Sequence, residues 1–162
     1  MQLLFISSNS SFNKCLREST FVHSFSNEQS CTTNPYTDCS SMQGITILTS
    51  TNYSFRSCSW ADCQSSAEAG AITFRDKTTN HLKVKTSNFI RCTSAATDYS
   101  QSAGAICAYN VCSISVSSSS FISCESTYRN GGGLCMYYIL QQPYITNCDF
   151  ISCFAFDDGG GV

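Results

Sequence analysis

Phe89-Ile90-Arg91-Cys92, followed after a polar loop by Ala103-Gly104-Ala105-Ile106-Cys107, is repeated a short distance along the chain. The second copy reads Phe121-Ile122-Ser123-Cys124, then a shorter loop, then Gly131-Gly132-Gly133-Leu134-Cys135. Each copy joins an F-x-x-C motif to a triplet of small residues centred on glycine, which is followed by an aliphatic residue. A motif pair that recurs in this way predicts a repeat fold.

The same pair of motifs occurs on both sides of this stretch. Upstream, Phe55-Arg56-Ser57-Cys58 precedes Ala69-Gly70-Ala71-Ile72, and downstream, Phe150-Ile151-Ser152-Cys153 precedes Gly159-Gly160-Gly161-Val162. A degenerate first copy begins at Phe12-Asn13-Lys14-Cys15. The phenylalanines at positions 55, 89, 121 and 150 are separated by 34, 32 and 29 residues. This period is typical of solenoids.

Inside each repeat the hydrophobic residues alternate as they do in β-strands. Leu82 and Val84 stand seven and five residues before Phe89, and Ile114 and Val116 have the same offsets in the next copy. A bend is expected just before each F-x-x-C motif, where Ser and Asn tolerate turn geometry. A further strand begins at each glycine triplet. Each repeat therefore predicts about three short strands and one variable loop.

These features predict an all-β fold, a right-handed parallel β-helix of about four to five coils. Residues 1–44 are expected to form an irregular or capping region with the degenerate first repeat, and residues 45–162 the β-helix repeats. We expect the repeats to continue beyond the C-terminus in a longer protein.

Equivalent residues of successive coils should stack about 4.8 Å apart and form columns. The predicted phenylalanine column is Phe12, Phe55, Phe89, Phe121 and Phe150; the cysteine column is Cys15, Cys58, Cys92, Cys124 and Cys153; the glycine column is Gly70, Gly104, Gly132 and Gly160.

The paired motifs resemble the repeats of polymorphic outer membrane proteins, which combine a GGA[ILV] element with F-x-x-N. Cysteine stands here where that family has asparagine, as in repeat families of protist surface proteins. The resemblance implies a pectin-lyase-like solenoid displayed at a cell surface and engaged in adhesion. It covers residues 45–162, about the whole predicted β-helix.

Composition agrees with a folded solenoid. Charged residues make up 12% of the chain and hydrophobic residues 42%, which is too hydrophobic for a disordered chain. The net charge is −2 without a basic stripe, so neither nucleic-acid binding nor attraction to anionic lipid is expected. The sequence contains neither a signal peptide nor an apolar run that could span a membrane, so this segment is not expected to insert directly into a membrane. The resemblance implies an extracellular or cell-surface location, and we expect this chain to be a segment of a longer protein.

The chain contains 12 cysteines. Buried thiols are favoured over disulfides in the F-x-x-C column, because an odd number of residues cannot pair completely. Cys107 and Cys135 form a second, outward column and are the best disulfide candidates, while Cys31 and Cys39 are candidates for a bridge in the irregular region. No metal site or cofactor is expected, because the cysteine pairs, such as Cys58 and Cys63, have C-x4-C spacing, no C-x2-C pair occurs, and neither His23 nor His81 lies beside these pairs.

Few residues suit catalysis. Asp157 and Asp158 lie in a loop before a glycine triplet, where Asp favours turns, and Asp149 occupies a polar repeat position. Lys83 and Lys85 alternate with hydrophobic residues and are interpreted as a solvated face. No catalytic residue is therefore assigned.

Tyrosines gather in and beside the variable loops, where they offer rigid contact area for a partner. The predicted binding surface comprises Tyr99, Tyr109, Tyr128 and Tyr137. The first interpretation is a non-enzymatic segment of a cell-surface protein with an adhesive or structural role, whose partner is a host or cell-surface protein or a polysaccharide. The alternatives are a pectin-lyase-like lyase or hydrolase that acts on polysaccharide, and a reading frame that is not expressed as this chain.

Overall fold

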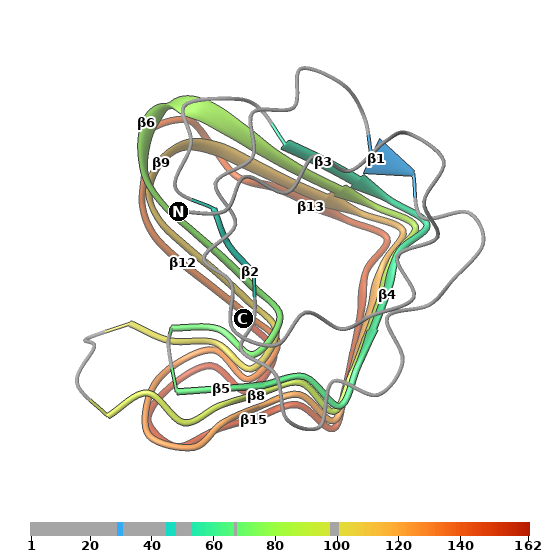
Figure 1. Cartoon of the computed structure of the whole chain (residues 1–162), viewed down its shortest axis with the longest axis vertical. Helices are drawn as coiled ribbons and strands as arrows, with labels where there is room; N and C mark the ends of the chain where they lie inside the picture. Colours follow the sequence, from blue (N-terminus) through green and yellow to red (C-terminus); the bar gives the residue numbers. More distant parts are fainter. Residues whose placement is uncertain (1–28, 31–44, 48–52, 67, 98–100) are drawn as a thin grey trace, which may run out of the picture.

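A computed structural model describes residues 29–30, 45–47, 53–66, 68–97 and 101–162. Within these residues all regular secondary structure is β-strand. The strands pair in parallel and form three sheets, which are the sides of a β-solenoid of about three turns (Figure 1). The predicted fold class is confirmed, although the described coils are fewer than the four to five expected.

The largest sheet has seven strands, and its long strands bend at a corner, so that this sheet covers two sides of the solenoid (Figure 1). Its order is β1–β3–β6–β9–β12, with β2 paired to β6 and β13 paired to β9. Its strands are β1 (Gln29–Ser30), β2 (Ile45–Ile47), β3 (Tyr53–Arg56), β6 (Ile72–Lys85), β9 (Ile106–Ser117), β12 (Leu134–Ile139) and β13 (Tyr144–Thr146).

The other two sheets have four short strands each. The second sheet, in the order β14–β10–β7–β4, contains β4 (Ser59–Ala61), β7 (Asn88–Ile90), β10 (Ser120–Ile122) and β14 (Asp149–Ile151). The third, in the order β15–β11–β8–β5, contains β5 (Gln64–Ser65), β8 (Thr93–Ser94), β11 (Glu125–Ser126) and β15 (Phe154–Ala155).

The long strands β6 and β9 show the alternation of buried and outward-facing residues that the sequence predicts. Leu82 pairs with Ile114 and Val84 with Val116, and all four side chains are buried in the core. The polar residues between them face outward, as the exposed Lys83 does. The strands therefore form where hydrophobic residues recur every second position.

Aromatic rings form a stack through the core, but Phe55, the second predicted member, does not belong to it. Phe89, Phe121 and Phe150 are in register, with ring centroids 4.8 and 4.7 Å apart. The residue below Phe89 is Trp60, whose ring lies 4.7 Å away and parallel to within 2°. Phe55 instead pairs with Val84 in the largest sheet and meets Trp60 edge-on at 5.4 Å. The prediction for Phe55 is wrong because a bend at Ser57 and Cys58 separates β3, which carries Phe55, from β4, which carries the stacked Trp60.

The cysteine column has the corresponding shift. Cys63, Cys92, Cys124 and Cys153 each follow a stacked aromatic residue by three positions, so Cys63 takes the place predicted for Cys58. All four are free thiols. The sulfur of Cys124 lies 3.5 Å from the carbonyl oxygen of Phe89, and Cys153 repeats this contact one coil further, at 3.4 Å from the carbonyl of Phe121. These thiols therefore link neighbouring coils as weak donors.

Cys58 belongs to the preceding bend. Its backbone N–H donates to Ser87 Oγ at 3.2 Å, and the N–H of Ser87 donates to Ser119 Oγ at 3.1 Å. Cys58, Ser87 and Ser119 thus form a column at this bend in successive coils. Cys148 continues the column, since the N–H of its neighbour Asp149 donates to the Ser119 carbonyl. Cys58 is disulfide-bonded, which corrects its assignment to a column of buried thiols.

Glycine is required at the column of Gly70, Gly104, Gly132 and Gly160 by close backbone approach. A Cβ atom on Gly104 would lie 2.0 Å from the carbonyl oxygen of Gly132 and 2.4 Å from the backbone nitrogen of Glu125. A Cβ atom on Gly70 would lie 2.2 Å from the Gly104 oxygen, and one on Gly132 would lie 2.1 Å from the Gly160 oxygen. Successive coils thus touch through bare backbone at this corner.

Phe12 and Cys15, predicted as the first column members, lie outside the described residues, as do Cys31 and Cys39. In the predicted N-terminal region 1–44, the structure describes only β1, which pairs with β3.

Candidate functional site

The long strands β6, β9 and β12 turn a corner at three non-glycine residues with positive φ. These are Asp76, Asn110 and Tyr138, with φ of 55°, 51° and 52°. Asn110 Nδ2 donates to Asp76 Oδ1 at 3.2 Å across neighbouring coils. Left-handed backbone is uncommon for tyrosine, so the corner imposes the conformation of Tyr138.

Three tyrosines meet at this corner and are called the tyrosine cluster here: Tyr109, Tyr137 and Tyr138. The rings of Tyr109 and Tyr137, which are register partners, stack with centroids 5.7 Å apart and planes 8° apart. Tyr138 stands edge-on to Tyr137 at 4.3 Å and to Tyr109 at 6.0 Å. Tyr137 and Tyr138 are 38% and 62% exposed, so the cluster presents ring surface to solvent.

Paired charges flank the tyrosine cluster on the preceding coil. Arg75 is the register partner of Tyr109 and forms an ion pair with Glu68, which is 7% exposed. Asp76 Oδ2 lies 4.0 Å from Arg75 Nε. The charged groups beside the rings are therefore one arginine and two carboxylates, which together carry one net negative charge.

Two cysteines lie next to the tyrosine cluster on the same strands. Cys107 and Cys135 are register partners, two residues before Tyr109 and Tyr137. Both are free thiols, so the disulfide considered for this pair is not formed in the structure. They pack with Ala69 and Ala103 in a small apolar cluster that is separate from the main core.

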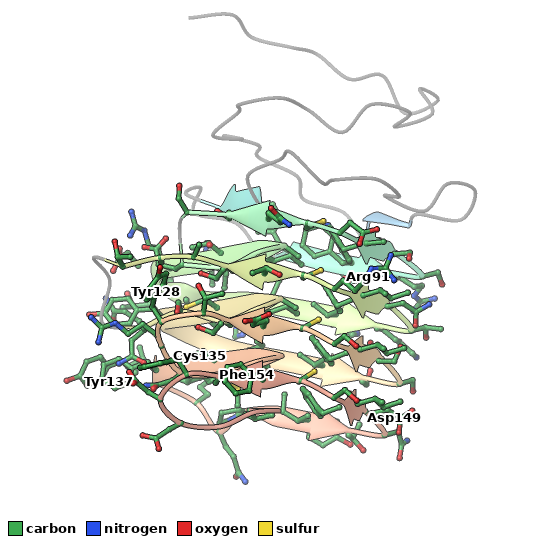
Figure 2. All side chains as sticks on the ribbon, turned by 90° about the horizontal axis from the view of Figure 1, so that it is seen from below. Arg91, Tyr128, Cys135, Tyr137, Asp149 and Phe154 are labelled. Atoms are coloured by element: carbon green, nitrogen blue, oxygen red, sulfur yellow. The ribbon has the colours of Figure 1, made fainter. Side chains whose placement is uncertain are left out.

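The remaining predicted binding residues are divided between described and undescribed parts of the chain. Tyr128 is 50% exposed on the loop after β11, and Figure 2 places it on the same side of the solenoid as Tyr137. Arg91 and Asp149 lie on the opposite side (Figure 2). Tyr99 lies outside the described residues.

The acidic residues weighed for catalysis have turn and surface positions. Asp149 is exposed in a polar column with Ser120, Asn88 and Ser59, as expected of a polar repeat position. Asp157 Oδ2 lies 3.8 Å from Arg129 Nη1 across neighbouring loops. Among the described residues, no three His, Cys, Asp or Glu side chains converge to hold a metal ion.

Several residues of the site are not in the predicted binding set. Tyr138 has no neighbour of its own type at the corner in β6 or β9, because Asp76 and Asn110 occupy those positions. Glu68 and Arg75 are seven residues apart and meet only because the loop folds against the strand. The adjacent Tyr137-Tyr138 pair was the one available signal, since consecutive strand residues rarely both offer exposed rings.

Comparisons of the chain with protein-family models, with curated proteins and with solved structures find no match. No helix long and apolar enough to span a membrane occurs in the residues that the structure describes.

Proposed function

We propose that this chain is a non-enzymatic binding segment of a cell-surface protein, and that the tyrosine cluster is its recognition surface. The observation that carries the proposal is that the rings of Tyr109, Tyr137 and Tyr138 pack against one another on paired strands, and that Tyr137 and Tyr138 remain exposed to solvent. Aromatic residues fixed on strands supply contact area with little loss of side-chain entropy on binding.

The neighbouring polar groups favour an uncharged, hydroxyl-rich ligand. Glu68 compensates the charge of Arg75, and Asp76, which accepts a hydrogen bond from Asn110, leaves one negative charge on this flank, so an acidic ligand is disfavoured. Tyrosine hydroxyls add further donors and acceptors at the rim. A neutral polysaccharide, whose sugars present both C–H faces and hydroxyls, matches this combination.

The surface location rests on the resemblance of the motifs to polymorphic outer membrane protein repeats. The finer pectin-lyase-like assignment has the same basis. Labelling of intact producing cells with an antibody against this segment tests the location. Labelling only after the cells are permeabilised would contradict it.

Affinity gel electrophoresis against a panel of neutral and acidic polysaccharides tests the binding surface. We expect a neutral polysaccharide to retard the wild-type chain, and Tyr137→Ala and Tyr138→Ala to lose at least about tenfold in affinity, or about 1.4 kcal/mol. Tyr144→Ala is the matched control, because Tyr144 is 61% exposed on β13, outside the tyrosine cluster. Equal retardation of all variants, or retardation by no member of the panel, would overturn the proposal.

A further inference from the structure

Cys107 and Cys135 are placed where a bond between them is within reach. They are register partners on the parallel strands β9 and β12, which sets their Cα atoms about 4.8 Å apart. This separation lies within the range that a disulfide accepts. Both side chains project from the same face, because they are in register.

The two thiols differ in access and surroundings. Cys107 is 1% exposed and Cys135 is 7% exposed. The sulfur of Cys135 lies 3.5 Å from Gln101 Oε1. The hydrogen bond from Cys107 lowers the pKa of Cys135, while the same bond, burial and the nearby Glu68 raise the pKa of Cys107. Cys135 is therefore the thiol that ionises and meets solvent first.

The inward cysteine column has a different chemistry despite the same spacing. The hydrogen bond from Cys153 lowers the pKa of Cys124, but the hydrogen bond to Cys92 and burial outweigh this effect and raise the pKa to about 12. The hydrogen bond to Cys124 and burial likewise raise the pKa of Cys153. These thiols lie against backbone carbonyls inside the solenoid. They are expected to stay protonated and inert.

We propose that Cys107 and Cys135 are a redox-active dithiol that closes to a disulfide by exchange with a low-molecular-weight disulfide such as glutathione disulfide. The Cys135 thiolate attacks one sulfur of glutathione disulfide, forms a mixed disulfide and releases one glutathione thiolate. Cys107 then loses its proton and attacks the Cys135 sulfur, which forms the Cys107–Cys135 bond and releases the second glutathione. The two protein thiols are oxidised, glutathione disulfide is reduced, and the two protons pass to the two leaving thiolates.

The bond is expected to be reversible. Side chains of in-register parallel strands point the same way, and a disulfide needs its Cβ atoms to approach more closely than the strands do. Closure therefore distorts the pair, and a distorted disulfide is more easily reduced. The distortion lies two residues from the stacked Tyr109 and Tyr137, so closure would also alter the packing of the tyrosine cluster.

Peptide mapping tests the exchange on the full chain. The reduced protein is equilibrated in glutathione buffers of increasing oxidation, quenched by alkylation and digested with trypsin. Cleavage after Arg91 and Arg129 places Cys107 and Cys135 on separate peptides, 92–129 and 130–162. The expected product is a covalent pair of these peptides, with the bond located at Cys107 and Cys135 by fragmentation and lost on reduction.

Variants separate the two roles. Cys107→Ser should stop at glutathione bound to Cys135, and Cys135→Ser should lose both the mixed disulfide and the linked peptides. The column already contains Thr73 in the preceding coil, so a hydroxyl fits there, and Cys107→Thr serves if the serine variant does not fold. Cys148→Ser is the control, because Ser87 and Ser119 occupy that column, and it should react like the wild type.

Two results would overturn the proposal. One is a wild-type chain whose Cys107 and Cys135 stay alkylated as free thiols in fully oxidised glutathione. The other is a Cys107→Ser variant that collects no glutathione at Cys135. Neither readout depends on a polysaccharide, so loss of ligand binding and loss of exchange remain distinguishable.

Discussion

At the scale of single residues, Gly104 gives the most direct test of the contact between coils. Alanine at this position would place Cβ against two backbone atoms, the Gly132 oxygen at 2.0 Å and the Glu125 nitrogen at 2.4 Å. Backbone cannot yield as a side chain does, so Gly104→Ala should cost about 3 kcal/mol or more. We expect thermal unfolding to show a melting temperature lower by roughly 10 °C.

Gly161→Ala is the matched control for this prediction. The nearest atom to its added Cβ is a side-chain carbon, Phe150 Cβ at 3.2 Å. A small local adjustment should accommodate it, so its melting temperature should stay close to wild type. Equal losses in the two variants would contradict the role assigned to backbone contact.

The ion pair of Asp62 and Arg91 predicts a pH effect on an exposed surface. Arg91 Nε donates to Oδ1 at 2.5 Å and Nη2 donates to Oδ2 at 2.7 Å. This hydrogen bonding holds the pKa of Asp62 below its usual value of 3.8. Because the pKa is lowered on folding, the stability from the pair is fully present above the usual value and lost as pH falls through the lowered one.

Carboxyl NMR titration measures this shift. Asp62 should titrate below 3.8 in the wild type and return toward 3.8 in Arg91→Gln. An unchanged midpoint in the variant would exclude Arg91 as the cause.

At the scale of elements, the ring stack joins four strands of the second sheet into one unit. Phe121 on β10 is fully buried between Phe89 and Phe150. Phe121→Asp would remove about 3–5 kcal/mol of packing and bury an unpaired charge, which is enough to abolish a cooperative melt. Phe156→Asp, at a residue that is 67% exposed, should melt nearly as wild type does. A cooperative melt of Phe121→Asp within a few degrees of wild type would disprove the internal position.

The loop between β11 and β12 should tolerate added length. Tyr128 is 50% exposed there, and loop closure entropy rises only slowly with length. A Gly-Ser-Gly-Ser insertion between Tyr128 and Arg129 should therefore give soluble protein with a small loss of stability. The same insertion between Ser123 and Cys124 should prevent folding, because it displaces the cysteine column from the aromatic stack. Failure of the first insertion, with folding of the second, would reverse the loop assignment.

The sequence predicts elements better than it predicts which element a residue occupies. The period and the alternation before Phe89 and Phe121 identified the coil and its three strands. Phe55 was misplaced because both bends of a coil can carry cysteine five residues apart, as Cys58 and Cys63 do, and the F-x-x-C pattern matched at the wrong one. Trp60, three residues before Cys63, was the signal for the correct choice.

The tyrosine cluster was only partly predictable for a different reason. Its corner depends on left-handed backbone at Asp76, Asn110 and Tyr138, three residue types that share no sequence pattern. The meeting of Glu68 with Arg75 depends on how a loop folds back, and hydrophobic periodicity does not encode loop paths.

At the scale of the whole molecule, stability should be graded along the solenoid axis. The strand β9 is paired with β6 on one side and with β12 and β13 on the other, whereas β14 pairs only with β10 among the described strands. Amide hydrogen exchange should be slowest in β9, at Val111, Ile114 and Val116. These amides should exchange at least about a hundredfold more slowly than those of β14, since opening free energies range from near zero at edges to the global value. Equal rates in the two strands would indicate a single all-or-none unit.

The stacked rings also make the protein its own optical reporter. Trp60 is the single tryptophan in the chain, is 2% exposed and, among the described residues, is the last ring of the stack, in parallel contact with Phe89. Its fluorescence should be blue-shifted in the native protein, because the indole is shielded from water. Any change that slides the coils past one another would move the emission to longer wavelengths. One unlabelled spectrum thus measures whether the coils are in register.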